Sequence, residues 1–240
     1  MCYLVFTISS AFRMKKMAHL EHLKSLCPLE GLHVVDVGAG DGVYSRQLDA
    51  AGANVTAIEI DPGKVAKARE ILPKSINFNL GAAEDLPLIT ASQDLACLFF
   101  SLHHVPSERQ SAGFGEIRRV LRSKGRLHIV EPYPYGTMFD VVRMVEDETI
   151  VRTNSHQLLN RLDGEHGFSL GKKREYVLTR EYPTFEFFLK KIVLPDPDRT
   201  RAYEALDSEM ADTFNKVKET LDGRVVLHQP CAAYHFSVTG

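Results

Sequence analysis

Three glycines stand at alternate positions behind a hydrophobic run in the stretch "HVVDVGAGDG". Gly38, Gly40 and Gly42 leave the backbone bare where a predicted strand gives way to a predicted helix. Glycine permits a sharp turn and a close ligand approach, and the amides and dipole of a helix N-terminus favour an oriented polar ligand. About 20 residues further on, Glu59 ends a second predicted strand, where a carboxylate can accept hydrogen bonds from ribose hydroxyls. This spacing predicts a ribose-bearing ligand at the carboxyl edge of a sheet.

Three interpretations of the loop compete. A nicotinamide dinucleotide requires the spacing G-x-G-x-x-G, whereas this loop has G-x-G-x-G. The glycine spacing therefore favours S-adenosylmethionine over a dinucleotide. A tight turn that binds no ligand is the third interpretation, and the correctly spaced Glu59 argues against it.

The elements that position these residues alternate between strand and helix. Strands are predicted over residues 33–37, 54–60, 75–80, within 92–102 and over 126–131, and helices over 17–27, 44–52, 62–72 and 106 to about 122. Asp61 is the expected N-cap of the third of these helices, and Gly125 is expected to separate the last helix from the fifth strand. Such alternation implies right-handed crossovers and a parallel sheet.

The pattern changes after Pro134. Residues 135–170 are expected to be helical and irregular, 173–182 to form a strand, 184–193 and 197–221 to form helices, and 224–238 to be extended. The sequence thus predicts an α/β fold, a doubly wound, Rossmann-like and mostly parallel sheet with an antiparallel last strand. No linker interrupts it, so we expect one domain over residues 1–240, with a cofactor-binding core at 33–132 and substrate-side elements at 135–222.

The composition argues against several classes of partner. The chain has 29 Lys and Arg against 31 Asp and Glu, a formal net charge of -2. Binding to nucleic acid or to an anionic membrane requires a clustered basic face, so neither is expected. Four scattered cysteines without a C-x-x-C pair indicate neither a zinc knuckle nor a disulfide framework and suggest a cytoplasmic protein. The apolar opening "MCYLVFTISS" is shorter than the roughly 18 residues that a membrane span needs.

Five segments in register resemble the seven-stranded S-adenosylmethionine-dependent methyltransferases. They are "VVDVGAGDG", "AIEIDP", "GAAEDLP", "DLACLFFSLHHV" and "EIRRVLRSKGRLHIVEP", which together span more than a third of the chain. The likeness is greatest to the branch that includes the ubiquinone and menaquinone C-methyltransferases and many small-molecule methyltransferases. It implies the same fold and methyl transfer from S-adenosyl-L-methionine to a small-molecule acceptor.

The resemblance also implies the roles of the cofactor-binding residues. The glycine loop would hold the methionine part, with Asp36 near its amino group; Glu59 would hold the ribose, and Ile60 would press on the adenine. The family often has Asp at the position of Ala82, so adenine would instead be recognised near Ala83 and by Glu84 or Asp85. An aromatic face suits the positive sulfonium, and Phe99 ends the fourth predicted strand.

Methyl transfer by in-line displacement depends mostly on proximity and orientation. His103, at the carboxyl end of the fourth strand, is the first candidate base, and the neighbouring His104 is the second. Tyr133, a further catalytic candidate, and Tyr135 follow the fifth strand and could either shape the acceptor pocket or pack beneath a lid. No group of residues has convincing metal-ligand spacing, so we expect no metal.

Later segments leave more than one interpretation open. The aromatic-rich stretch "TFEFFLKKIVLP" could pack on the sheet, cap the acceptor pocket or form a homodimer contact. Arg143, Arg152 and His156 could meet an anionic acceptor, although solvated positions are the simpler interpretation. The alternative functions are a non-catalytic scaffold or partner subunit of the same fold, an NAD(P)-dependent oxidoreductase and an RNA methyltransferase.

Overall fold

The computed structural model describes residues 18–206 and 208–239, which form two compact units. The sheet unit comprises residues 18–131, 154–174 and 232–239. The extension unit comprises residues 132–153 and 175–231, apart from residue 207. Both units are assembled from segments far apart in the sequence. That the whole chain acts as one domain stays a prediction.

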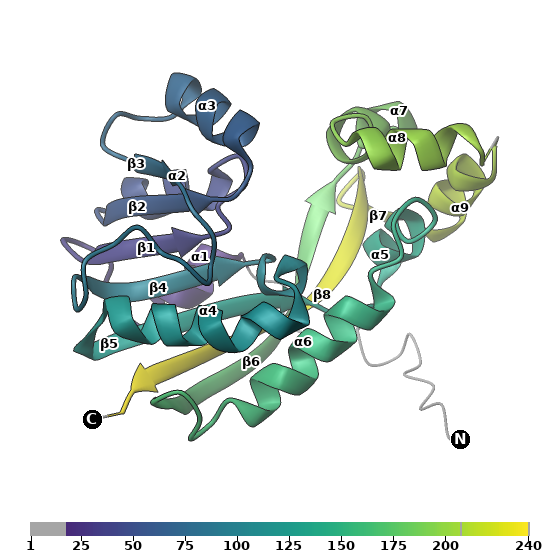
Figure 1. The fold of residues 1–240 in the computed structure, drawn as a ribbon. Coiled ribbons are helices and arrows are strands. Elements are labelled where there is room, and N and C mark those ends of the chain that lie inside the picture. The colour runs from purple at the N-terminus through teal and green to yellow at the C-terminus, as the bar shows by residue number, and fades with distance from the viewer. Residues whose placement is uncertain (1–17, 207, 240) are drawn as a thin grey trace. The chain divides into compact units, whose positions relative to one another are not determined.

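Within the described residues one eight-stranded sheet has the order β3-β2-β1-β4-β5-β8-β6, with β7 paired to β8. The strands are β1 His33–Val37, β2 Asn54–Glu59, β3 Asn77–Leu80, β4 Gln93–Phe99, β5 Leu121–Pro132, β6 Phe168–Glu181, β7 Glu219–Leu221 and β8 Arg224–Val238. Strands β1 to β5 pair in parallel, and β8 runs in the opposite direction (Figure 1). The predicted fold class is confirmed, and β7 adds one short strand to the seven expected.

Helices flank the parallel strands on both faces. Those of the sheet unit are α1 His19–Lys24, α2 Val43–Ala50, α3 Pro62–Ile71, the short 3-10 helix η2 Leu102–His104 and α4 Ser107–Val120. Figure 1 shows α4 in front of the sheet and α1 behind it. The extension unit holds α5 Thr137–Val142, α7 Phe185–Phe188, the π-helix η3 Leu189–Val193, α8 Pro197–Glu204 and α9 Glu209–Val217, whereas α6 Thr149–Arg161 contributes residues to both units.

Local sequence explains why the elements around the glycine loop form. In β1 and β4 nearly every side chain is buried, as expected for central parallel strands covered on both faces. Helix α3 begins as predicted: the Asp61 carboxylate accepts hydrogen bonds from the Gly63 amide at 2.7 Å and the Lys64 amide at 3.1 Å. Pro62 occupies the first turn, where its missing amide hydrogen costs nothing.

The strand order places a topological switch point beside β1. The chain leaves β1 towards β2 and β3 on one side and returns to β4 on the other. In open parallel sheets, ligands bind outside the carboxyl ends of the strands at this point. The glycine loop follows β1 directly, so the fold puts it at the expected ligand-binding edge.

The region around Gly125 differs from the prediction. Strand β5 begins at Leu121, directly after α4, and Gly125 lies within it. Gln93 pairs with Leu121 and Leu95 pairs with Arg126, so the residues in between on β5 bulge out of the ladder. The glycine therefore serves a β-bulge and does not end a helix, because its missing Cβ avoids the Arg122 carbonyl, which would lie 2.9 Å away.

The single helix predicted over residues 197–221 is also wrong. Helix α8 ends at Glu204, α9 spans Glu209–Val217, and the segment closes with strand β7. Strands β7 and β8 form an antiparallel hairpin whose turn is Asp222-Gly223, both with positive φ. An Asp-Gly pair is a strong hairpin signal, so the sequence held the information that periodicity alone missed. Strand β6 likewise begins at Phe168, five residues before the predicted start.

The extension unit has an apolar core of its own. Phe188, Val193, Met210 and Phe214, each at most 1% exposed, pack with buried residues of α5 and β8 and with Tyr182, which follows β6. The aromatic stretch "TFEFF" thus places Phe188 in this core and leaves Phe187 40% exposed. Across the described part of the chain, no helix has the length and apolar character needed to cross a membrane.

Candidate functional site

The glycine loop is anchored on one side and open on the other. The amides of Gly38 and Ala39 both donate to the Ile58 carbonyl of β2 at 2.9 Å. A Cβ at Gly38 would lie 2.5 Å from the Ser101 Cβ, whereas a Cβ at Gly40 would meet no atom within 4 Å. Both glycines have positive φ. The loop therefore packs tightly at Gly38 and presents accessible backbone at Gly40.

Glu59 connects this loop to the end of β2. Its Oε2 accepts a hydrogen bond from the Gly40 amide at 2.8 Å, and its Oε1 accepts from the Ile60 and Asp61 amides at 3.0 Å each. The residue is only 6% exposed. The two features singled out from the sequence, 19 residues apart, are thus in direct contact. Gly42 is the N-cap of α2, so the loop leads straight into a helix N-terminus.

Asp36 lies under the loop. It is 1% exposed, and its Oδ2 accepts a hydrogen bond from the Ser45 hydroxyl of α2 at 2.6 Å. Burial raises the pKa of Asp36 to about 6, the Ser45 hydrogen bond opposes that increase, and the nearby Glu59 carboxylate adds to it. The sequence reasoning did not identify Ser45. A hydroxyl three residues after the last loop glycine was the available signal.

The predicted adenine-binding residues lie directly after β2 and in the segment after β3. Ile60 is 64% exposed, and Leu80, which faces Glu59 in the β2–β3 register, is 52% exposed. Two apolar side chains are therefore presented beside the loop, and Leu80 is one that sequence reasoning missed.

The polar residues predicted to bind adenine, Glu84 and Asp85, make contacts within the protein. Glu84 forms an ion pair with Arg109 of α4 at 2.8 Å. Asp85 is exposed, and its amide donates to the Ala82 carbonyl at 3.2 Å. Ala83 packs near Gly113, where an added Cβ would lie 3.6 Å from the Ala83 Cβ.

Phe99 lies in an aromatic cluster under the end of β4. It is 5% exposed and stacks on Tyr44 of α2 with 4.6 Å between ring centroids. The next residue, Phe100, has φ of 57°, a strained value for a residue with a side chain. Ser101 follows, and its hydroxyl donates to the Val37 carbonyl at 2.7 Å. This geometry fixes the end of β4 against the glycine loop.

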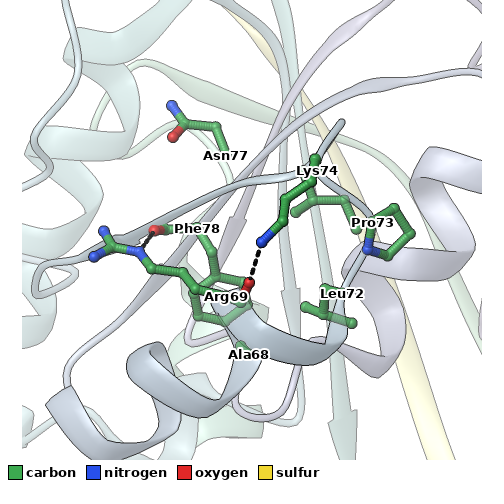
Figure 2. Close-up of a pocket in the computed structure, with 8 residues that line it drawn as sticks. Ala68, Arg69, Leu72, Pro73, Lys74, Asn77 and Phe78 are labelled. Atoms are coloured by element: carbon green, nitrogen blue, oxygen red, sulfur yellow. Dashed lines mark hydrogen bonds between the residues drawn. The ribbon is translucent and has the colours of Figure 1, made fainter.

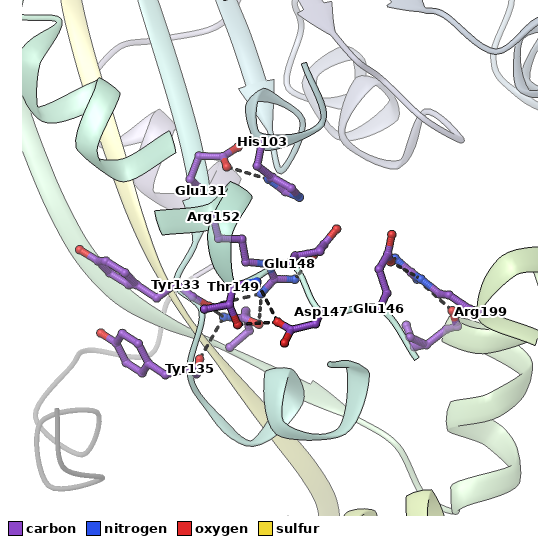
Figure 3. A network of polar contacts seen from close by, with 12 residues as sticks. His103, Glu131, Tyr133, Tyr135, Glu146, Asp147, Glu148, Thr149, Arg152 and Arg199 are labelled. Carbon is purple, nitrogen blue, oxygen red and sulfur yellow. Dashed lines mark hydrogen bonds and ion pairs between the residues drawn. The ribbon is translucent and has the colours of Figure 1, made fainter. Parts of the chain in front are cut away.

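His103 is paired with a buried carboxylate. Its Nδ1 lies 2.7 Å from Oε2 of Glu131, the penultimate residue of β5, and the two side chains are 3% and 0% exposed (Figure 3). The other oxygen of Glu131 accepts from the Leu102 amide at 3.2 Å. A carboxylate on Nδ1 fixes the ring orientation and the tautomer in which Nε2 accepts a proton. His104 is exposed, with its ring centroid 4.1 Å from that of His103.

Tyr133 belongs to the extension unit. Its hydroxyl donates to Oε1 of Glu175 at 2.5 Å, and its ring stacks on Tyr135 with 5.1 Å between centroids. Burial, aided by the Glu175 carboxylate, raises the pKa of Tyr135 to about 12.

Arg152 is not the solvated residue that the sequence suggested. It is 8% exposed and forms an ion pair with Glu148 at 2.6 Å (Figure 3). Its guanidinium also donates to the Tyr133 carbonyl at 3.3 Å and to Oε1 of Gln229 at 3.2 Å. These contacts hold the Tyr133 backbone in place, so Arg152 is a structural residue of the extension unit.

Buried histidines form a separate group in the sheet unit. His128 is fully buried between His22 and His235. The ring centroids of His22 and His128 are 5.8 Å apart, and Nδ1 of His235 lies 3.3 Å from Nδ1 of His128. Burial, with cationic neighbours, lowers the pKa of His22 and of His235 to about 4. Burial also lowers the pKa of His128 well below the usual value. These histidines are therefore neutral core residues at neutral pH.

A hollow of about 380 Å³ lies elsewhere on the sheet unit, between the end of α3 and β3 (Figure 2). Its lining includes Arg69, whose Nε donates to the Phe78 carbonyl, and Lys74, which donates to the Arg69 carbonyl, both at 2.7 Å. None of the predicted site residues lines it. We therefore assign the candidate site to the glycine loop and the strand ends around it.

The strand order, the switch point and the glycine loop joined to an acidic residue at the end of β2 define the fold of the seven-stranded methyltransferases. Residues 35–129 match the family model of the methyltransferase domain. This match confirms the resemblance predicted from the sequence.

Known proteins with similar sequences or structures are also described as methyltransferases. The chain is 33% identical over 110 residues to a demethylmenaquinone methyltransferase of Clavibacter sepedonicus, covering 45% of this chain and 44% of that protein. The chain thus spans less than half of the length of this relative. A crystal structure described as a methyltransferase from Bacillus halodurans has a TM-score of 0.62 at 18% identity, covering 92% of this chain and 99% of that one. A SAM-dependent methyltransferase from Aquifex aeolicus has a TM-score of 0.54 at 16% identity, covering 92% and 89%. At these identities the two structures establish the fold.

Proposed function

We propose that this protein is an S-adenosyl-L-methionine-dependent methyltransferase that acts on a small-molecule acceptor. The observation that carries the proposal is the contact between Glu59 and the Gly40 amide. It places a carboxylate that can bind ribose hydroxyls next to the exposed backbone of the glycine loop, at the switch point of the sheet. The methyltransferase-domain match over the same segment supports it.

The residues present fit the cofactor. Open space at Gly40 allows a ligand to approach the backbone, and Glu59 offers carboxylate oxygens at the same place. Exposed Ile60 and Leu80 provide apolar faces of the kind that an adenine ring covers. The buried Asp36 carboxylate supplies negative charge for the ammonium group of the methionine part.

The cofactor, when bound, supplies an electrophilic methyl group on a sulfonium. The protein's contribution is to position the acceptor and to exclude water. His103 is the proposed base: the Glu131 carboxylate on its Nδ1 orients the ring and stabilises the imidazolium that forms when the ring takes the acceptor's proton.

A small acceptor is favoured over RNA because the chain carries a formal net charge of -2. The relative named for demethylmenaquinone supports an acceptor of the quinone class. The reduced form of a quinone is a phenol, whose acidic hydroxyl proton gives a base such as His103 a role.

Calorimetric titration with S-adenosylhomocysteine, compared with NAD, tests the cofactor assignment. We expect saturable binding of the former and none of the latter. Metabolite extracts incubated with protein and S-adenosylmethionine should then yield a product heavier by one methyl group in mass spectrometry. Binding without any methylated product would favour the scaffold alternative, and binding of NAD alone would overturn the proposal.

A further inference from the structure

We propose that Ser45 is a positioning residue for the cofactor: its hydroxyl holds the Asp36 carboxylate ionised and oriented towards the ammonium group of the bound amino acid. This inference rests on the proposed function. It adds a role for a residue of α2 that no loop motif includes.

The geometry places Ser45 and Asp36 at the two ends of the glycine loop. Asp36 is the penultimate residue of β1, and Ser45 lies in the first turn of α2, with the loop between them. Their side chains meet at 2.6 Å, and they are 0% and 1% exposed. A buried hydrogen bond of this length joins the strand to the helix directly beneath the backbone that would receive the ligand.

The surroundings of Asp36 otherwise oppose its ionisation. In the parallel register it lies beside Ala57 of β2 and Cys97 of β4. The titratable groups that face it are Glu59 and Cys97. The negative charge of Glu59 raises the pKa of Asp36. The Cys97 thiol stays protonated, because burial and the Asp36 carboxylate raise the pKa of the thiol. Burial raises the pKa of Asp36 further, to about 6, and the Ser45 hydroxyl is the contact that counteracts these effects.

The chemical consequence concerns a cationic ligand. An ammonium group gains from an ionised Asp36 and gains little from the neutral acid. Affinity should therefore be full above the pKa of Asp36 and should fall as the pH decreases through it. Removing the hydroxyl takes a charge-assisted hydrogen bond from the carboxylate, which should move that midpoint up by about one to two pH units.

The test measures the Kd of S-adenosylhomocysteine by calorimetry in buffers from about pH 5 to pH 8.5. Wild type and variants are compared at each pH, because titration of the ligand's own ammonium group then affects all of them equally. Ser45→Ala should shift the midpoint of the affinity loss from about pH 6 towards pH 7–8. At the alkaline end its Kd should equal that of the wild type. Ser45→Thr, which keeps the hydroxyl, should restore the wild-type profile. Ser25→Ala is the matched control, since Ser25 donates a 2.6 Å hydrogen bond to a carbonyl in α1, and its profile should not change.

Asp36→Asn provides a second route that does not depend on the folding of Ser45→Ala. Its affinity should be reduced and independent of pH, and adding Ser45→Ala to it should cause no further pH shift. An unchanged midpoint in folded Ser45→Ala, or a persistent pH dependence in Asp36→Asn, would overturn the role of Ser45 and leave the proposed function intact. Wild-type protein that binds no S-adenosylhomocysteine at any pH would instead refute the proposed function, and this inference with it.

Discussion

Glu59→Ala is the substitution for which the structure makes the most quantitative prediction. A carboxylate has about four acceptor sites. Three of those on Glu59 are used by the Gly40, Ile60 and Asp61 amides. One site remains for a ribose hydroxyl, and a hydrogen bond to a charged group contributes about 1.5–3 kcal/mol. The substitution should therefore weaken cofactor binding about 10- to 150-fold.

The same substitution also affects stability, by an amount that the contacts define. The Ile60 and Asp61 residues are exposed, so their amides can bind water when the carboxylate is removed. The Gly40 amide is partly buried and loses its partner, which should cost about 1–3 kcal/mol of the free energy of unfolding. Glu59→Gln keeps one acceptor oxygen and should lie between wild type and Glu59→Ala in both quantities.

Calorimetry with S-adenosylhomocysteine gives the affinity, and urea unfolding without ligand gives the stability. Glu70→Ala is the matched control, because Glu70 is an exposed carboxylate on α3 and its removal should change neither quantity. A folded Glu59→Ala protein whose Kd stays within about twofold of the wild type would refute the ribose assignment.

Three further predictions concern catalysis, acid stability and the loop. His103→Ala should lower kcat by about 10²- to 10⁴-fold, with the Kd for S-adenosylhomocysteine unchanged, as measured with any acceptor found by the methylation screen. Because the pKa of His22 and of His235 is lowered to about 4 in the fold, the unfolded chain binds more protons below pH 6.5. The free energy of unfolding should thus fall by on the order of 2 kcal/mol between pH 7 and pH 5 in urea titrations. Gly38→Ala should destabilise the protein by about 2–4 kcal/mol, and Gly40→Ala by only about 1–2 kcal/mol, because only Gly38 adds a clash to the backbone strain of a positive φ.

Each of these predictions has an outcome that contradicts it. Full turnover in His103→Ala would exclude it as the base. The raised pKa of Asp36, about 6, has the opposite effect: by itself it would increase the free energy of unfolding as the pH falls. A free energy of unfolding that stays constant or increases down to pH 5 would therefore show that His22 and His235 are not buried in the neutral form. Equal destabilisation by the two alanines would mean that Ser101 does not pack against Gly38.

The central part of this protein follows from local sequence. The buried run of β1, the alternate glycines, the Asp61 cap and the acidic residue ending β2 were all readable, because strand burial, turn chemistry and capping depend on residues close together in the chain. Repeating strand–helix units then fixed a parallel sheet, since right-handed crossovers leave few topologies.

Tertiary structure decided which distant residues meet. The pairing of His103 with Glu131, 28 residues apart, depends on β4 and β5 ending side by side. The contact of Asp36 with Ser45 depends on how α2 packs under the loop. Solvated positions were the simpler interpretation of the charged residues after residue 134, and only the fold showed Arg152 to be buried and paired. Sequence periodicity reports which face of an element is apolar, but a hydrogen bond between side chains depends on ångström-scale placement of two elements, which only their packing determines.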